Sequence, residues 1–144
     1  MEIWMIGYGI GGSEIFKAIK PGLANQLQCK DQLELINISE YAIRINPDGT
    51  YIDETKILDE IIYKRPDIII NETSNGTHIQ TKIAALAYAV GIPIISILDI
   101  WGDYQRRFNT PIDYIIVPSN TIRNEVLEHV SNFESKIHST EVLV

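Results

Sequence analysis

Sulfur ligands and metal-binding clusters are scarce in this sequence. The 144 residues contain one cysteine, Cys29, and three histidines. A single cysteine forms no intramolecular disulfide, and no Cys/His group has the spacing of zinc ligands. The composition is therefore compatible with a reducing compartment and predicts no structural metal site.

Long apolar runs are absent as well. No run approaches the roughly 20 residues that a membrane-spanning helix needs, and the start, MEIWMIGYGIGG, lacks the basic flank and cleavage pattern of a signal peptide. We therefore expect a cytoplasmic protein without a membrane span. The length predicts a single domain over residues 1–144, large enough to bury a core.

Positive charge is in short supply. Lys and Arg number 12 against 19 Asp and Glu, which gives a formal net charge of −7. This balance argues against broad electrostatic binding to nucleic acid or to an anionic membrane. A small-molecule nucleotide ligand, bound at a local site, is the expected partner.

Short apolar runs alternate with segments of helical periodicity. Strands are expected at residues 2–8, 33–39, 67–71, 93–100 and 113–118, with a further strand at 136–144. The alternation predicts an α/β fold, namely a single Rossmann-like three-layer domain. Its parallel sheet should have five or six strands in an order near 3-2-1-4-5.

Capping residues and breakers predict where the helices begin and end. Ser13 and Asp53 are expected N-caps, as is Ser119 or Asn120, and Pro21-Gly22 is expected to end or break the first helix. The sequence NPDG at 46–49 is a strong turn signal, which predicts a small hairpin or an excursion within residues 41–52.

The strongest chemical signal is a glycine-rich loop between the first strand and the first helix. Gly7, Gly9 and Gly12 satisfy the pattern G-x-G-x-x-G in the context that dinucleotide-binding folds use. The missing side chains let the backbone approach a phosphate, and the helix amino end favours that charge. The candidate binding residues here are Gly7, Gly9, Gly11, Gly12 and Ser13. A tight turn that needs glycine for packing is the alternative.

An NAD-type site also needs a carboxylate near the end of the second strand to bind ribose hydroxyls. Glu40 is the best candidate, although its distance from the glycines exceeds the usual spacing. NAD(P) therefore stays open as a ligand beside a nucleotide sugar.

Two further polar segments follow expected strands. The first supplies the candidate ligand-binding residues Thr73, Ser74, Asn75, Gly76 and Thr77. Their hydroxyl and amide groups suit phosphate or sugar hydroxyls, but the same residues are typical of an ordinary helix-capping loop.

The second segment, residues 99–108, combines aromatic and charged residues. Trp101, Tyr104 and Phe108 are spaced so that a helix would place them on one face, which packs on the core or on another subunit. In the alternative interpretation Trp101 or Tyr104 stacks on a base or sugar, Arg107 pairs with phosphate, and Asp99 binds hydroxyls.

A family resemblance comes from residues 66–108 together with PIDYIIVPS. A strand, a small polar loop, a helix ending in Gly-Ile-Pro and a strand leading to Asp99, Trp101, Tyr104, Arg107 and Phe108 resemble the N-terminal Rossmann-like domain of bacterial polysaccharide-biosynthesis glycosyltransferases of the two-domain B type. The glycine loop is also similar to NAD- and nucleotide-sugar-binding domains. The resemblance implies a nucleotide-sugar ligand and a second domain that a partner chain would supply.

Two functions of different class follow. One is a nucleotide- or nucleotide-sugar-binding half-enzyme in glycan biosynthesis. The other is a stand-alone NAD(P)-binding or sensor module, with a dehydrogenase-like protein as a further alternative. No catalytic residue is identified, and the aromatic-rich segment predicts a homodimer or association with a partner chain.

Overall fold

The computed structural model describes residues 1–28, 30–73, 79–98, 107–108, 110–133 and 141–143. Its strands are β1 (Glu2–Gly7), β2 (Gln32–Asn37), β3 (Thr50–Tyr51), β4 (Ile68–Glu72), β5 (Ile94–Ile97), β6 (Tyr114–Ile116) and β7 (Glu141–Leu143). Its helices are α1 (Ile10–Gln26), α2 (Glu40–Ile45), α3 (Ile57–Lys64), α4 (Ile79–Val90) and α6 (Asn120–Phe133).

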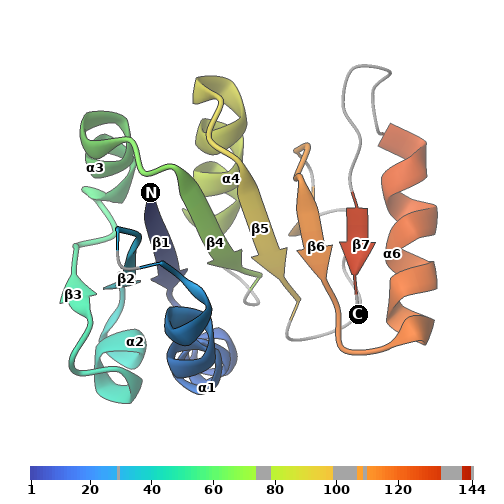
Figure 1. Ribbon diagram of the computed structural model, residues 1–144. Helices are drawn as coiled ribbons and strands as arrows, with labels where there is room; N and C mark the ends of the chain where they lie inside the picture. Colours follow the sequence, from blue (N-terminus) through green and yellow to red (C-terminus); the bar gives the residue numbers. More distant parts are fainter. Residues whose placement is uncertain (29, 74–78, 99–106, 109, 134–140, 144) are drawn as a thin grey trace.

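The strands form one sheet in the order β3-β2-β1-β4-β5-β6-β7, and every neighbouring pair is parallel. In the centre, Met5 of β1 lies opposite Leu35 of β2 on one side and Ile70 of β4 on the other. The chain builds outward from β1 to β3, then crosses back to β4 and builds the other half (Figure 1). Open α/β sheets bind ligands at this switch in strand order, outside the carboxyl ends of the strands.

The predicted Rossmann-like parallel sheet is confirmed, and the segment at 41–52 completes it. This segment forms the short helix α2 and the two-residue strand β3, which takes the third place in the sheet. The Asn46 side chain anchors the excursion by donating a 2.9 Å hydrogen bond to the Ser13 carbonyl in α1. The strand at 67–71 is therefore fourth in the chain and lies directly beside β1.

Alternating side chains of the buried strands pack on both faces of the sheet. Trp4 and Ile6 of β1 belong to the larger core cluster, which includes Ile61 of α3, Ile83 of α4 and Val126 of α6. The smaller cluster on the other face contains these residues: Ile3, Met5, Phe16, Leu35, Ile70 and Ile97. Helices thus cover both faces, which gives the expected three layers.

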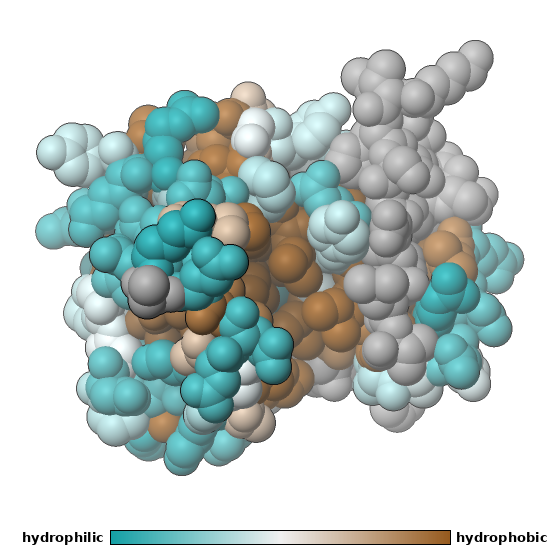
Figure 2. Space-filling model, viewed as in Figure 1, coloured by the Kyte–Doolittle hydropathy of each residue, from teal (hydrophilic) through white to brown (hydrophobic). Residues whose placement is uncertain are grey.

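The surface of the molecule is uneven in polarity. In the view of Figure 2, hydrophilic side chains cover much of the left-hand part, and hydrophobic side chains gather near the middle. Ile68, Ile95 and Ile116 are only partly buried where they pack against the smaller cluster. Among the residues that the structure describes, no helix is both long and apolar enough to cross a membrane.

Two predictions for α1 are wrong. Ser13 does not cap the helix, because α1 begins at Ile10 with Gly9 as its N-cap, and Ser13 is buried inside the first turns. Pro21 does not end the helix, which continues to Gln26. Leu23 and Leu27 follow the proline and pack against the smaller cluster, and this burial outweighs the hydrogen bond that proline removes.

Capping in the rest of the chain follows the predictions in part. Asp53 does not cap α3, which begins at Ile57; its carboxylate instead accepts hydrogen bonds from the N–H (2.9 Å) and hydroxyl (2.6 Å) of Thr55. Ser39 caps α2 by accepting from the Ala42 N–H at 3.1 Å. At the start of α6, the Ser119 hydroxyl accepts from the Ile122 N–H at 3.3 Å, as predicted.

Two glycines with equally open surroundings should respond to alanine in opposite directions. An added Cβ meets nothing within 4 Å at either Gly22 or Gly91, but Gly91 alone of the two has a positive φ, 79°. Gly22→Ala, inside α1, should raise the free energy of unfolding by about 0.5–1 kcal/mol. Gly91→Ala should lower it by about 1–2 kcal/mol. Urea unfolding measures both, and shifts of the same sign would contradict the assigned backbone conformations.

Candidate functional site

The glycine loop, residues 7–12, joins the carboxyl end of β1 to the amino end of α1. Gly9 is the N-cap and has an extended backbone, with φ −86° and ψ 168°. The first N–H groups of a helix have no acceptor within the helix, and they carry its partial positive charge. The loop therefore presents donors at the sheet edge where the sequence predicts a ligand.

Gly7 allows α1 to pack closely on β1. A Cβ at this position would lie 3.1 Å from Ser13 Oγ and 3.4 Å from Phe16 Cδ2. Both contacts are tighter than, or at the limit of, ordinary van der Waals distance. The packing role that the sequence left open therefore applies to Gly7.

The side chain of Glu72 occupies the glycine loop. Glu72 ends β4, the neighbour of β1, and its side chain is fully buried. Its Oε1 accepts hydrogen bonds from the N–H groups of Tyr8, at 2.6 Å, and Gly9, and from Gln80 Nε2 at 3.1 Å. The sequence places Glu72 in a polar segment after a strand, but the expected β-strand order alone does not reveal that it reaches the glycines.

Gly12 leaves the space that the Glu72 carboxylate fills. A Cβ built on Gly12 would lie 1.2 Å from Oε2 and 2.6 Å from the Cβ of Glu72. Moving the carboxylate alone would not relieve the second contact. The third glycine of the motif is thus matched to an acidic side chain of the same chain.

Thr73 and Arg107, two predicted site residues, lie together beyond the end of β4. The Arg107 guanidinium donates to the Thr73 carbonyl, and the Thr73 N–H donates to the Ile97 carbonyl at 3.2 Å. Both Thr73 and Arg107 are buried. Phe108 is fully buried in the larger core cluster, which confirms the core interpretation for this member of the aromatic series. The other predicted residues of these two segments lie outside the described residues: Ser74, Asn75, Gly76, Thr77, Asp99, Trp101 and Tyr104.

A pocket of about 280 Å³ adjoins the glycine loop at the carboxyl ends of β1 and β2. We call it the tyrosine pocket, and its lining residues are Tyr8, Ile38, Ser39, Glu40, Tyr41, Tyr51, Asp53 and Glu54. Tyr8 belongs to the glycine loop, and Glu40 is the first residue of α2. The structure therefore brings the predicted carboxylate into the same pocket as the loop.

Burial and nearby carboxylates favour the neutral form of two phenols of the tyrosine pocket, Tyr8 and Tyr51. Burial raises the pKa of Tyr8 above its ordinary value, with further contributions from the negative charge of Glu54 and from Tyr41. The hydrogen bond that Tyr51 donates to Asp53, at 3.1 Å, is the largest cause of a raised pKa at Tyr51. The pKa of Asp53 is lowered, chiefly by the Thr55 hydroxyl. At neutral pH the pocket combines uncharged aromatic rings with an ionised Asp53.

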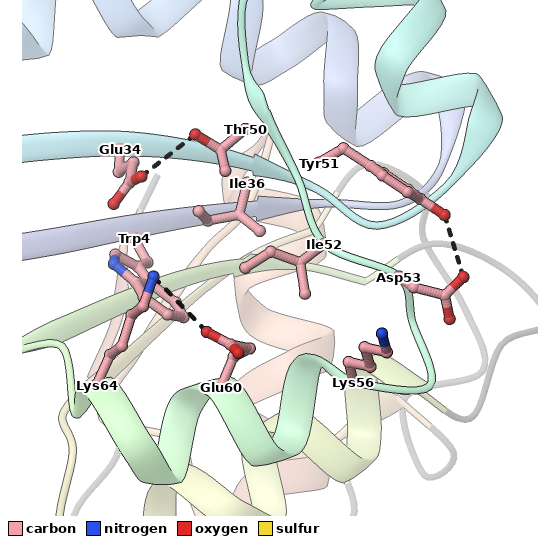
Figure 3. A pocket seen from close by; sticks show the side chains of 10 residues that line it. All are labelled: Trp4, Glu34, Ile36, Thr50, Tyr51, Ile52, Asp53, Lys56, Glu60 and Lys64. Carbon is pink, nitrogen blue, oxygen red and sulfur yellow. Dashed lines mark hydrogen bonds and ion pairs between the residues drawn. The ribbon is translucent and has the colours of Figure 1, made fainter.

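A second pocket, of about 400 Å³, lies between the β2–β3 edge and α3 (Figure 3). Some of its polar side chains contact one another: Lys64 pairs with Glu60 at 3.6 Å, and the Thr50 hydroxyl donates to Glu34 at 3.2 Å. It shares Tyr51 and Asp53 with the tyrosine pocket. None of the predicted ligand-binding residues lines it.

The parallel sheet, its strand order and the glycine loop between β1 and α1 together define a Rossmann-like α/β domain. No protein-family model matches the chain, and no curated protein matches it. A solved structure of UDP-N-acetylglucosamine 2-epimerase is similar in fold, with a TM-score of 0.66 and 10% sequence identity. The likeness covers 90% of this chain and 45% of that one, so the chain spans less than half the length of this structural neighbour.

Gly12 and Glu72 should be energetically coupled. Gly12→Ala should lower the free energy of unfolding by about 1–3 kcal/mol, because the new methyl group overlaps the Glu72 side chain. In a Glu72→Ala background the same substitution should cost less than about 0.5 kcal/mol. A double-mutant cycle by urea unfolding measures this coupling, and equal costs in the two backgrounds would show that the overlap is absent.

Two phenols of the tyrosine pocket, Tyr8 and Tyr51, should titrate above pH 10.0, the ordinary value. NMR-detected titration of Tyr51 in Asp53→Asn should show a lower pKa than in the parent, because the carboxylate acceptor is gone. Since the folded-state pKa is raised, the neutral phenols stabilise the fold below pH 10, and this contribution is lost as the pH rises through the folded-state pKa. Glu54→Gln is the matched variant for Tyr8, whose pKa should fall when the negative charge of Glu54 is removed. An unchanged Tyr51 pKa in Asp53→Asn would show that the hydrogen bond to Asp53 does not raise the pKa of Tyr51.

Proposed function

We propose that this chain is a nucleotide- or nucleotide-sugar-binding domain and one half of a glycosyltransferase-type enzyme of glycan biosynthesis. The observation that carries the proposal is the tyrosine pocket, which adjoins the glycine loop at the carboxyl edge of the sheet. Tyr8 belongs to both features, so a ligand in the pocket lies next to the helix amino end. This is the position at which open α/β sheets bind their ligands.

The chemistry of the pocket suits the uncharged part of such a ligand. The rings of Tyr8, Tyr41 and Tyr51 offer faces for a base or a sugar. The carboxylates of Glu40 and Glu54 provide acceptors for pairs of ribose or sugar hydroxyls. A volume of about 280 Å³ accommodates one nucleoside-sized group rather than a whole dinucleotide.

The phosphates of the ligand belong outside this acidic pocket. Arg107 lies at the end of the neighbouring strand β4 through its bond to Thr73 and puts a positive charge at this edge, whereas the N–H groups of Tyr8 and Gly9 at the amino end of α1 already donate to Glu72. The net charge of −7 makes such local positive sites the places where a phosphate gains most.

The assignment to a glycosyltransferase-type enzyme rests on the likeness in fold. The structural neighbour is named for a nucleotide sugar, and this chain corresponds to 45% of it. A partner chain, or a second copy of this chain, would supply the remaining wall of the ligand site.

A stand-alone NAD(P)-binding or sensor module is the second candidate, and Glu40 favours it. This carboxylate begins α2 directly after β2 and lines the pocket together with the glycine-loop residue Tyr8. A carboxylate after the second strand is the group that binds the adenosine ribose in dinucleotide-binding folds.

Ligand titration of four probes tests the proposal and separates the two candidates. The parent chain should bind UDP and UDP-N-acetylglucosamine in calorimetry, more tightly than NAD⁺ or NADP⁺. Tyr41→Ala should weaken that binding by about tenfold or more, the usual value of one stacking contact. Tyr63→Ala is the matched control, because Tyr63 is 84% exposed and lies outside the pocket.

Glu40→Gln decides between the candidates. A loss of about tenfold or more in NAD⁺ affinity, with UDP compounds bound weakly, would replace the nucleotide-sugar assignment by the dinucleotide one. Failure of the parent chain to bind any of the four probes would refute both.

A further inference from the structure

We infer that Glu72 occupies the anion site of the glycine loop, and that a phosphate reaches this loop only by displacing the Glu72 side chain. The inference deepens the proposed function, on which it rests for the identity of the phosphate-bearing ligand. It assigns Glu72 as the residue that determines which ligands can use the loop.

The first support is the set of donors that surround the carboxylate. The N–H groups of Tyr8 and Gly9 both donate to Oε1, and Gln80 Nε2 donates to the same atom. These backbone donors are the kind that hold a phosphate in a glycine-rich loop. A peptide N–H that already donates a strong bond to a carboxylate is not available to a phosphate oxygen.

The second support is steric. Glu72 is fully buried, and its carboxylate lies where a side chain on Gly12 would otherwise be, 1.2 Å from an ideal Cβ. The missing side chain at position 12 thus leaves space that either the Glu72 carboxylate or a phosphate can fill. Both anions require the same volume above the first turn of α1, so they cannot be present together.

Selectivity follows from this competition. The Glu72 carboxylate belongs to the same chain, so it competes for the loop at a high effective concentration. It therefore weakens the binding of every ligand whose phosphate must enter the loop. A dinucleotide in the usual Rossmann pose puts its pyrophosphate there. Ligands that fill the tyrosine pocket and keep their phosphates away from the Tyr8 and Gly9 N–H groups avoid the competition.

Inorganic pyrophosphate is the direct probe, titrated by calorimetry into the full chain and two variants. Glu72→Gln keeps the size of the side chain and removes its charge, whereas Glu72→Ala empties the site. Pyrophosphate should bind Glu72→Ala about tenfold or more tightly than it binds the parent, the value of one charge-assisted hydrogen bond regained. Glu72→Gln should also bind it more tightly than the parent, by a smaller factor, because the neutral amide still fills the site. If Glu72→Ala does not fold, Glu72→Gln carries the test.

Asp113→Asn is the matched control. Asp113 also accepts a bond from a backbone N–H, that of Ile94 at 2.9 Å, but it does so at the amino edge of the sheet. This variant should bind pyrophosphate as the parent does. The backbone amide signals of Tyr8 and Gly9 should shift on pyrophosphate addition in the Glu72 variants and stay unchanged in the parent.

The outcomes separate this inference from the proposed function. Equal pyrophosphate affinity in the parent and the Glu72 variants, or binding in none of them, overturns the role of Glu72. Tighter pyrophosphate binding in the variants, with no binding of UDP-N-acetylglucosamine by the parent, supports the role of Glu72 and refutes the proposed function. Binding of UDP-N-acetylglucosamine by the parent, with pyrophosphate affinity unchanged in the variants, supports the proposed function and refutes the role of Glu72.

Discussion

The hydrogen bonds between Glu72 and the glycine loop tie together the two strands at which the sheet reverses its order. β1 and β4 are neighbours, and the Glu72 carboxylate spans from the end of β4 to the N–H groups of Tyr8 and Gly9. Buried backbone donors require acceptors, and a buried carboxylate requires donors. The contact also requires glycine at position 12, where a Cβ would overlap the Glu72 side chain, and it involves Tyr8, which lines the tyrosine pocket.

The site that results divides into two parts with different chemistry. The tyrosine pocket is acidic and aromatic, and burial and nearby carboxylates raise the pKa values of Tyr8 and Tyr51. The glycine loop, directly beside it, is a cluster of donors that faces an anion. A nucleotide has the same division between an uncharged nucleoside and its phosphates. In this chain the donors of the glycine loop, which would suit the phosphates, already bond to the Glu72 carboxylate.

The elements that the sequence predicted well are those whose pattern comes from burial. Apolar runs such as Ile68–Ile70 can be covered on both faces only as inner strands of a parallel sheet. Local rules failed where tertiary contacts were stronger. Pro21 lies inside α1, because the helix beyond it packs on the sheet, and Ser13 is buried in the helix that it was expected to cap. Residues 41–52 form a helix and a strand, held in place by Asn46.

The sequence by itself determined the fold class and the place of the glycine loop, since strand and helix periodicity and glycine spacing are local properties of the chain. It did not determine what the loop holds. Glu72 lies 63 residues from Gly9, and no pattern marks which polar residue at or beyond the end of β4 turns toward the loop. That choice depends on the β1–β4 pairing, which brings the two strand ends side by side and puts one carboxylate within reach of unpaired backbone donors.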